Sequence, residues 1–257
     1  MPLYNSADTI EDAVQSVLSQ QYELWELIII DDNSMDNSME IAKRYSAIDS
    51  RIVVYKTKKN VGSGQARNIG ISKSSGELIA FLDSDDMWLS NKLNTQVKMF
   101  ENKNVTFVCS SYQKFHNTSN KTESVGVPDR IYYEDMLKTN YIGCLTVILK
   151  RSAYKNLQFP DMRKRQDYAL WLTLLKDGTK VYCSNEILAR YRYGHISTTS
   201  NKIKSIMDTW KVYREFLDFN FFPSVNYFVH YLIRGFFRTK FPKLSIFLGF
   251  SYLINKE

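Results

Sequence analysis

The chain has few of the residues that mark disulfide-rich, collagen-like or low-complexity proteins. Only three of its 257 residues are cysteine, and Cys109, Cys144 and Cys183 show no CxxC spacing. This excludes a disulfide framework or a cysteine zinc cluster and favours a reducing compartment. Ten glycines and five prolines are too few for a collagen-like or repetitive chain. No apolar run reaches the roughly 18 residues that a membrane-spanning helix needs.

What remains is a globular composition, with 44% hydrophobic and 24% charged residues and a net charge of +7. The charge is unevenly placed, because residues 201–257 carry nine Lys and Arg against four Asp and Glu. Of the 36 aromatic residues, 15 lie between Trp210 and Tyr252. We therefore expect a first domain at residues 1–200 and a basic, aromatic helical region at residues 201–257. We expect no nucleic-acid partner.

The first 90 residues alternate between helical and strand patterns. Apolar residues from Ile10 to Leu18 follow helical spacing, and Asp8 with Glu11 resembles a capping box. A short run of apolar and β-branched residues at 25–30 predicts a buried strand. Further strands are expected at residues 51–55 and 77–82, and further helices at residues 36–45 and 63–73. This order predicts βαβ units on a parallel sheet.

The second half predicts a mixed extension of that sheet. Helices are expected at residues 91–101 and 166–176, and strands at residues 105–110, 146–150 and 179–183. From residue 202 the pattern is helical, with breaks near Pro223 and Pro242. Residues 1–5 enter the first helix with no strand before it, so we expect the first strand to be missing or truncated.

Two acidic clusters each follow a predicted strand. Asp31 and Asp32 follow one, and the Asp83-Ser84-Asp85-Asp86 segment follows another. The carboxyl ends of parallel strands share one edge, where α/β sheets bind ligands. Alternating carboxylates can hold Mg²⁺ or Mn²⁺ together with phosphate oxygens. The alternative interpretation is that these residues only form turns and helix caps.

Five ordered motifs together resemble one family. They are Pro2-Leu3-Tyr4-Asn5, residues 16–20, residues 30–34, Ala66-Arg67-Asn68 and residues 81–86. They are similar to the nucleotide-sugar domain of family 2 glycosyltransferases. The resemblance implies an α/β fold with a GT-A type sheet flanked by helices, here with a C-terminal helical extension. Residues 163–171 resemble a subgroup that builds bacterial surface polysaccharides, including teichuronic acid type enzymes, and all motifs together cover residues 1–200.

The resemblance also implies roles for individual residues around a nucleotide-sugar donor. Pro2, Tyr4 and Asp32 would surround the nucleobase, with Asp31 nearby. Arg67 would lie near the base or the diphosphate, Asp83 near the ribose, and Asp85 would bind Mn²⁺ or Mg²⁺. In the loop at residues 191–200, Arg192 would pair with phosphate, and His195 would be a metal ligand or phosphate contact.

Asp167 matches the family's general base, preceded here by Gln166 where the family usually has Glu. Deprotonating an acceptor hydroxyl requires such a base. Two alternatives stay open, since an acid in a first helical turn is also favoured by the helix dipole, and His195 can be an ordinary surface residue. The basic residues Arg163, Lys164 and Arg165 can attract an anionic lipid-diphosphate acceptor or simply be solvated.

The segment at residues 244–254 is apolar but too short to cross a bilayer. Lys240, Lys243 and Lys256 flank it, so it can lie on an anionic membrane surface or pack against protein. The chain is thus expected to be an inverting, metal-dependent glycosyltransferase at the inner face of the plasma membrane. It would move a sugar from a nucleotide donor, preferably uridine-linked, to a lipid-linked glycan acceptor.

Two other classes of function compete with this one. A phosphatase with an aspartyl nucleophile would also place an acidic motif after a strand, but the chain offers no convincing partner lysine. A non-catalytic, membrane-associated nucleotide-sugar-binding subunit would keep the donor site without turnover, although Asp85 and Asp167 favour an enzyme.

Overall fold

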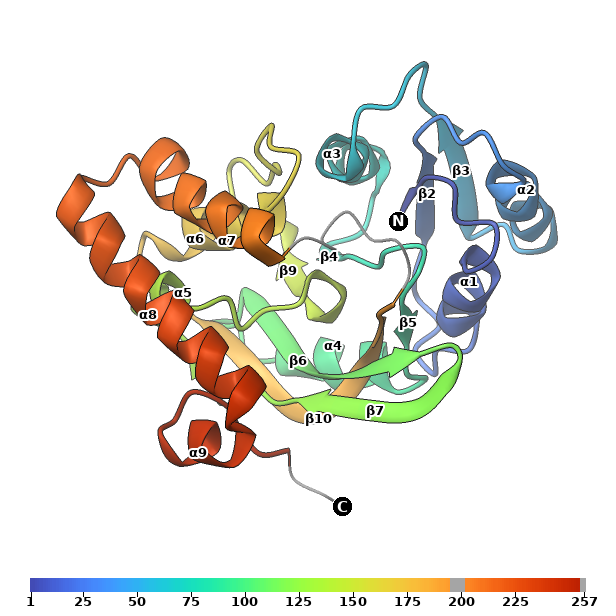
Figure 1. The fold of residues 1–257 in the computed structure, drawn as a ribbon. Helices are drawn as coiled ribbons and strands as arrows, with labels where there is room; N and C mark the ends of the chain where they lie inside the picture. Colours follow the sequence, from blue (N-terminus) through green and yellow to red (C-terminus); the bar gives the residue numbers. More distant parts are fainter. Residues whose placement is uncertain (195–201, 255–257) are drawn as a thin grey trace.

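A computed structural model describes residues 1–194 and 202–254. Its N-terminal part is a three-stranded parallel sheet in the order β1-β2-β3, with helices packed against it (Figure 1). The elements are β1 (Pro2–Leu3), α1 (Ile10–Leu18), β2 (Leu27–Asp31), α2 (Ser38–Ile48), β3 (Ile52–Lys56) and α3 (Ser63–Lys73). Every residue of β2 is buried, which explains its continuous apolar sequence.

The first helix uses its predicted apolar stripe but not its predicted cap. Ile10, Ala13 and Val14 are fully buried against the sheet. The residue before the helix is Thr9, which makes no side-chain capping bond, so the capping box expected at Asp8 and Glu11 is wrong. Instead the Ser6 carbonyl oxygen accepts hydrogen bonds from the Thr9 and Ile10 amides, which satisfies donors of the first turn.

A second, mixed sheet has the order β4-β9-β6-β10-β5, with β7 beside β6 and β8 beside β10. Its strands are β4 (Leu78–Ala80), β5 (Met87–Trp88), β6 (Phe107–His116), β7 (Ser119–Val125), β8 (Arg130–Ile131), β9 (Ile148–Lys150) and β10 (Val181–Arg192). We expected β4 to extend the parallel sheet, but it pairs antiparallel with β9. Among the described residues, no strand of one sheet pairs with a strand of the other.

The chain starts with a strand of only two residues, β1, and the expectation that the first strand is missing or truncated stays a prediction. β1 pairs in parallel with β2, with Pro2 opposite Ile30 and Leu3 opposite Asp31. The Met1 amino group donates to the Ile28 carbonyl oxygen at 2.8 Å. A cavity of about 800 Å³ lies beside it, lined by Met1 and by residues of β2 and β4. Burial lowers the pKa of the Met1 amino group to about 5.

The remaining helices pack on the second sheet and on one another. They are α4 (Lys92–Met99), α5 (Tyr133–Lys138), α6 (Gln166–Leu175), α7 (Lys202–Lys211), a π-helical turn (Val212–Phe216), α8 (Phe221–Lys240) and α9 (Pro242–Phe247). Pro223 stands in the first turn of α8 and Pro242 begins α9, as their positions in the sequence predict. Figure 1 shows α8 running along one side of the molecule, with α5 beside it.

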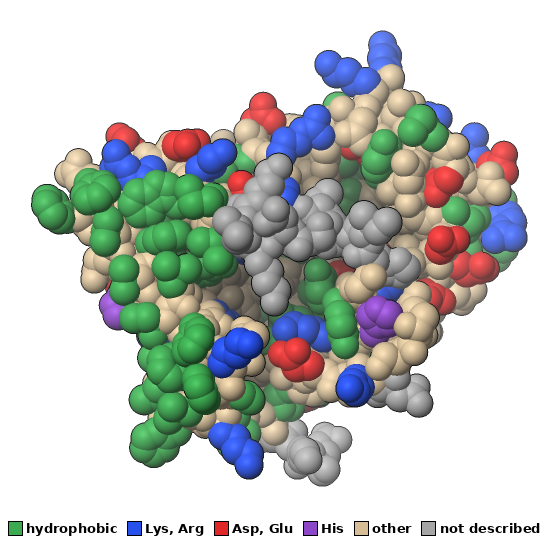
Figure 2. Space-filling model, in the orientation of Figure 1, with side chains coloured by type: hydrophobic (Ala, Val, Ile, Leu, Met, Phe, Trp, Pro, Cys, Tyr) green, Lys and Arg blue, Asp and Glu red, His purple; other side chains and the backbone are tan. Residues whose placement is uncertain are grey.

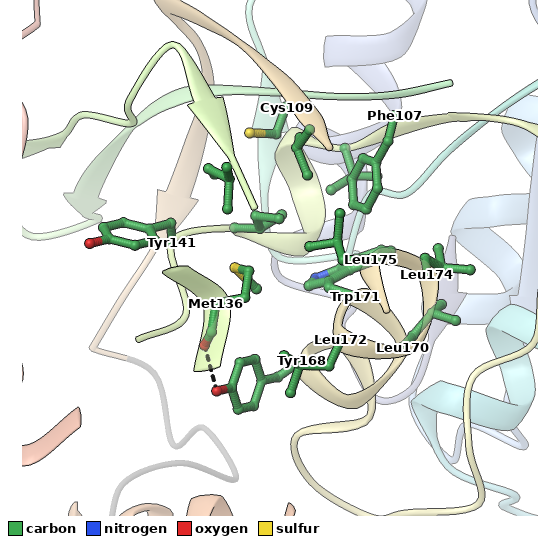
Figure 3. Close-up of a cluster of buried hydrophobic side chains, with 14 of the residues drawn as sticks. Phe107, Cys109, Met136, Tyr141, Tyr168, Leu170, Trp171, Leu172, Leu174 and Leu175 are labelled. Carbon is green, nitrogen blue, oxygen red and sulfur yellow. Dashed lines mark hydrogen bonds between the residues drawn. The ribbon is translucent and has the colours of Figure 1, made fainter. Parts of the chain in front are cut away.

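The larger core lies around α6 and joins the C-terminal region to the rest of the chain. Trp171 of α6 is fully buried among aromatic rings, including Phe107 at 5.4 Å (Figure 3). The Tyr168 hydroxyl donates to the Met136 carbonyl oxygen at 2.7 Å. Tyr213, from the π-helical turn, is also fully buried in this core. The residues after 201 therefore share a core with α6.

Candidate active site

The acidic segment forms a turn that follows β4. The Asp86 amide donates to the Asp83 carbonyl oxygen at 3.1 Å. Asp83 and Asp85 are half-buried, whereas Asp86 is 2% exposed and accepts a hydrogen bond from the Arg192 amide at 2.9 Å. Burial raises the pKa of Asp86 well above its usual value, and the Asp85 and Asp83 carboxylates raise it further. The turn thus leaves two carboxylates partly accessible and buries the third.

Arg67 of α3 lies at the centre of the site. Its guanidinium is buried and forms a hydrogen-bonded ion pair with Asp83. It also lies 5.3 Å from the centre of the Phe159 ring. Burial opposes its positive charge, but Asp83, with a smaller contribution from Asp167, holds the pKa of Arg67 above its usual value. Three residues predicted from separate motifs, Arg67, Asp83 and Asp167, therefore lie close enough to interact.

Asp167 stands in the first turn of α6 and is half-buried. The preceding Gln166 is 8% exposed, and its Nε2 donates to Ser63 Oγ at 2.8 Å. Ser63 is the first residue of α3, so this bond ties the start of α6 to the start of the helix that carries Arg67.

The Asp32 carboxylate organises the loop before α3. Its oxygens accept hydrogen bonds from the Val61 amide at 2.7 Å, the Gly62 amide at 2.8 Å and the Thr57 hydroxyl at 3.1 Å. Gly62 has a φ of +88°, a conformation that favours glycine over other residues. A carboxylate has about four acceptor positions, of which three are used here, and Asp32 is only 2% exposed. The predicted contact with a nucleobase stays a prediction.

Asp31 has the contacts of a turn residue. It is fully buried, and its Oδ1 accepts a hydrogen bond from the Ser34 amide at 3.3 Å. Lys56 Nζ lies 4.0 Å from its Oδ2, which has no hydrogen-bond partner. These contacts match the alternative interpretation of Asp31, in which it stabilises the turn after β2.

The loop after β1 lies beside the acidic segment. Pro2 is buried within β1, whereas Tyr4 is 45% exposed. A hydrogen bond of 2.9 Å joins Ser84 Oγ to Ser6 Oγ. The two parts of the predicted donor site, the Tyr4 loop and the acidic segment, are thus held together even though their strands belong to different sheets.

Arg192 is 5% exposed and its guanidinium is bonded within the protein. Its Nε donates to the Asp85 carbonyl oxygen at 2.8 Å, its Nη2 to Asp12 Oδ2 at 2.7 Å, and its Nη1 to Asn117. These contacts fix the backbone of the acidic segment. The predicted pairing of Arg192 with phosphate stays a prediction, and His195 lies outside the described residues.

The carboxylates of the acidic segment suit a hard divalent cation. Asp83 and Asp85 are partly accessible oxygen donors two residues apart. Within residues 1–194 and 202–254, no group of three or more His, Cys, Asp or Glu could hold a metal ion by itself. A cation here would need further oxygen ligands, and Mg²⁺ and Mn²⁺ commonly take these from substrate phosphates.

The family model described as Glycosyl transferase family 2 matches residues 1–157. The chain belongs to glycosyltransferase family 2. It is 40% identical over 231 residues to a Bacillus subtilis (strain 168) glycosyltransferase named for teichuronic acid biosynthesis, TuaG, covering 90% of this chain and 92% of that one. It is 38% identical over 237 residues to the Escherichia coli UDP-Glc:alpha-D-GlcNAc-diphosphoundecaprenol beta-1,3-glucosyltransferase WfgD, covering 91% of each.

Solved structures place this family 2 glycosyltransferase in the GT-A fold. The S. aureus TarS 1-349 complex with UDP-GlcNAc matches with a TM-score of 0.69 and 19% identity, covering 83% of this chain and 63% of that chain. The mannosyltransferase PcManGT from Pyrobaculum calidifontis, in complex with GDP-Man and Mn²⁺, matches with a TM-score of 0.67 and 14% identity, covering 89% and 66%. At these identities the likeness concerns the fold alone. The fold class expected from the motifs is confirmed.

Sequence reasoning missed the residues that hold the site together. Asp86 belongs to the acidic segment, but no separate role was predicted for it. A third carboxylate in such a segment indicates either a bound cation or a buried side chain that accepts hydrogen bonds from the protein. Asp12 gave no signal, because an acid in the first turn of α1 is expected on helix-dipole grounds alone. Its contact with Arg192 spans 180 residues of sequence.

Proposed function

We propose that this glycosyltransferase moves a sugar from a uridine diphosphate sugar to a glycan on a lipid carrier, with inversion at the anomeric carbon. The observation that carries the proposal is the grouping of Arg67, Asp83 and Asp167 in one site. The names of relatives support the substrates, since WfgD and a second Escherichia coli protein, WfaP, 39% identical over 204 residues, both act with UDP-Glc on a diphosphoundecaprenol-linked sugar.

In this mechanism Asp167 accepts the proton of the acceptor hydroxyl. As the proton leaves, the hydroxyl oxygen forms a bond to the anomeric carbon and the bond from that carbon to the diphosphate oxygen breaks. Attack from the face opposite the leaving group inverts the configuration. Because Asp167 is half-buried at the start of α6, its carboxylate is accessible to the hydroxyl of a large acceptor. Its fixed position on the helix supports general-base catalysis.

The guanidinium of Arg67 would stabilise the leaving diphosphate. It forms an ion pair with Asp83, and it would place positive charge near the departing group. Asp85, with Asp83 beside it, would hold Mn²⁺ or Mg²⁺. When bound, such an ion neutralises the negative charge that develops on the diphosphate. Pro2, Tyr4 and Asp32 would form the nucleobase end of the site, with the buried Asp31 stabilising the adjacent turn.

The C-terminal helices would hold the enzyme at the cytoplasmic face of the plasma membrane as a peripheral protein. None of the helices in the described parts of the chain is both long and apolar enough to cross a membrane. Figure 2 shows hydrophobic side chains gathered on the side of the molecule that α8 and α9 form in Figure 1. The exposed apolar residues there are Phe221, Phe222, Val229, Leu232, Ile233, Phe236, Phe241, Leu244, Phe247 and Leu248.

We take an anionic bilayer as the partner of this apolar face because exposed basic residues border it. Lys240, the last residue of α8, and Lys243, in the first turn of α9, are both exposed. Each basic residue near an anionic surface contributes about 1 kcal/mol, and the apolar side chains add binding that salt does not screen. A lipid-linked acceptor would be presented at the same surface.

A transfer assay on the purified chain tests the proposal. Uridine diphosphate hexoses and N-acetylhexosamines are offered with a short-chain polyprenyl diphosphate N-acetylhexosamine, with Mn²⁺, with Mg²⁺ or with a chelator. We expect a disaccharide-lipid product by mass spectrometry and an inverted anomeric configuration by NMR. Binding of the nucleotide sugar without transfer to any such acceptor would support the non-catalytic binding subunit instead.

A further inference from the structure

Arg165, the residue before α6, has a backbone conformation that is uncommon for a residue with a long side chain. Its φ is +60° and its ψ is 15°, in the left-handed region. Among the described residues three others besides glycine have positive φ, and each is Asn or Asp, which tolerate this region. A strained conformation of this kind persists only where surrounding contacts hold it.

The guanidinium of Arg165 supplies those contacts by joining α6 to the C-terminal helices. Its Nη2 donates to Ser205 Oγ at 2.7 Å, to the Ser205 carbonyl oxygen at 3.3 Å and to the Tyr231 hydroxyl at 2.9 Å. Ser205 belongs to α7 and Tyr231 to α8. The neighbouring Lys164 adds an ion pair with Asp208 of α7 at 3.9 Å.

The other side of the α6 start is attached to the donor half of the protein. Gln166 donates to Ser63 at the beginning of α3, as described above, and the Arg165 carbonyl oxygen accepts the Ala169 amide at 2.9 Å within the first turn of α6. The turn that carries Asp167 is therefore held between α3 on one side and α7 and α8 on the other.

We propose that Arg165 is a positioning residue through which α7 and α8 set the place of Asp167. This inference rests on the proposed function of Asp167 as the base. The C-terminal region then has a second task besides membrane contact: it fixes the base relative to the donor. Of the two interpretations that the sequence left open for residues 163–165, neither describes the Nη2 group of Arg165, because this group donates inside the protein rather than to an acceptor lipid or to solvent.

Two substitutions on opposite sides of the contact test this role in the transfer assay. Arg165→Gly keeps access to the left-handed backbone but removes the guanidinium. Tyr231→Phe keeps the ring and removes the hydroxyl acceptor. We expect kcat to fall roughly 10- to 100-fold for Arg165→Gly, since small misplacements of a catalytic group have effects of this size. The KM for the donor and the affinity for UDP should stay within about twofold, because the donor residues are untouched.

Tyr231→Phe should lower kcat by a smaller factor, and the double variant should lose no more than Arg165→Gly alone, because both changes remove the same contact. Arg165→Lys should recover part of kcat, since it restores the charge but not the planar fork of donors. Lys155→Ala, an exposed basic residue in the segment before α6, is the matched control and should keep normal turnover.

The outcomes separate this inference from the proposed function. Equal losses of kcat and of UDP affinity in Arg165→Gly would overturn the positioning role and indicate general damage to the fold. Normal kcat in Arg165→Gly, in a chain where Asp167→Asn abolishes transfer, would also overturn it while leaving the base assignment intact. Normal turnover in Asp167→Asn would remove the proposed function itself. If Arg165→Gly does not fold, the kcat of Tyr231→Phe decides.

Discussion

Moving the amino group of Met1 out of its buried position should stabilise the protein, and most strongly at acidic pH. The group donates to the Ile28 carbonyl oxygen and lies beside the cavity between β2 and β4. Burial lowers its pKa from 8.0 to about 5. Between these two values the unfolded chain binds more protons than the folded chain, so the free energy of unfolding rises with pH across this window.

The size of the effect follows from the two pKa values. With 8.0 in the unfolded chain and about 5 in the folded one, linkage gives a penalty of about 1 kcal/mol at pH 7 that grows to about 4 kcal/mol at pH 5. A chain extended by Gly-Ser-Gly-Ser before Met1 carries its amino group away from this site. It should therefore be more stable than the unextended chain by about these amounts.

The register of β1 on β2 allows a sharper comparison. Because Pro2 pairs with Ile30, four residues added before Met1 would lie opposite residues 25–28 and enter the cavity. A Val-Thr-Val-Ile extension should exceed the Gly-Ser extension in stability at every pH, since it buries apolar side chains and pairs open strand edges. Urea unfolding at pH 5, 6, 7 and 8 measures both effects. The burial of the amino group would be refuted if the stability difference between the Gly-Ser chain and the unextended chain did not change with pH. Strand addition would be refuted if the two extended chains were equally stable.

Further predictions concern the site, the core and the membrane face. Asp85→Ala should abolish the Mn²⁺-dependent part of UDP affinity in calorimetry, and unchanged metal-dependent binding would show that the cation site is elsewhere. Lys92 is fully buried and burial lowers its pKa to about 7, so stability should rise between about pH 7 and 10, and Lys92→Met should flatten this rise in urea titrations. Truncation before Leu244 should release the protein from anionic vesicles in sedimentation while UDP binding persists; equal sedimentation of both forms would count against the membrane face. A thermal-shift screen of nucleotide sugars should give the largest stabilisation with a uridine diphosphate sugar and Mn²⁺ or Mg²⁺.

Periodicity and local motifs predicted the helices and strands whose formation depends on nearby residues in the sequence. The helix expected at residues 63–73 forms as α3, because Gly62 supplies the turn before it and its sequence is continuous to Lys73. The strand expected at residues 25–30 forms as β2, one residue longer at its end and two shorter at its start. The motifs also named Arg67, Asp83 and Asp167; the structure pairs Arg67 with Asp83, and the roles predicted for all three residues stay predictions.

Long-range pairing could not be predicted in the same way. The run at residues 77–82 has the same apolar pattern whether its strand pairs parallel with β1 or antiparallel with β9, so the sheet order escaped sequence reasoning. The contacts of Arg192 with Asp12 and of Arg165 with Tyr231 join residues 180 and 66 positions apart. No local pattern marks such pairs, and a basic residue in a loop gives no sign of whether it will be solvated or buried.

The central claim is that Asp167 is the base of an inverting glycosyl transfer, and the turnover of Asp167→Asn measured together with donor binding tests it most directly. Asparagine keeps the size of the side chain and removes its capacity to accept a proton. The transfer rate should fall roughly 10²- to 10⁴-fold, the usual range for loss of a general base, while UDP-sugar affinity stays near normal. A variant that transfers sugar at a near-normal rate would contradict the account and leave Asp167 as an acid that only stabilises the start of α6.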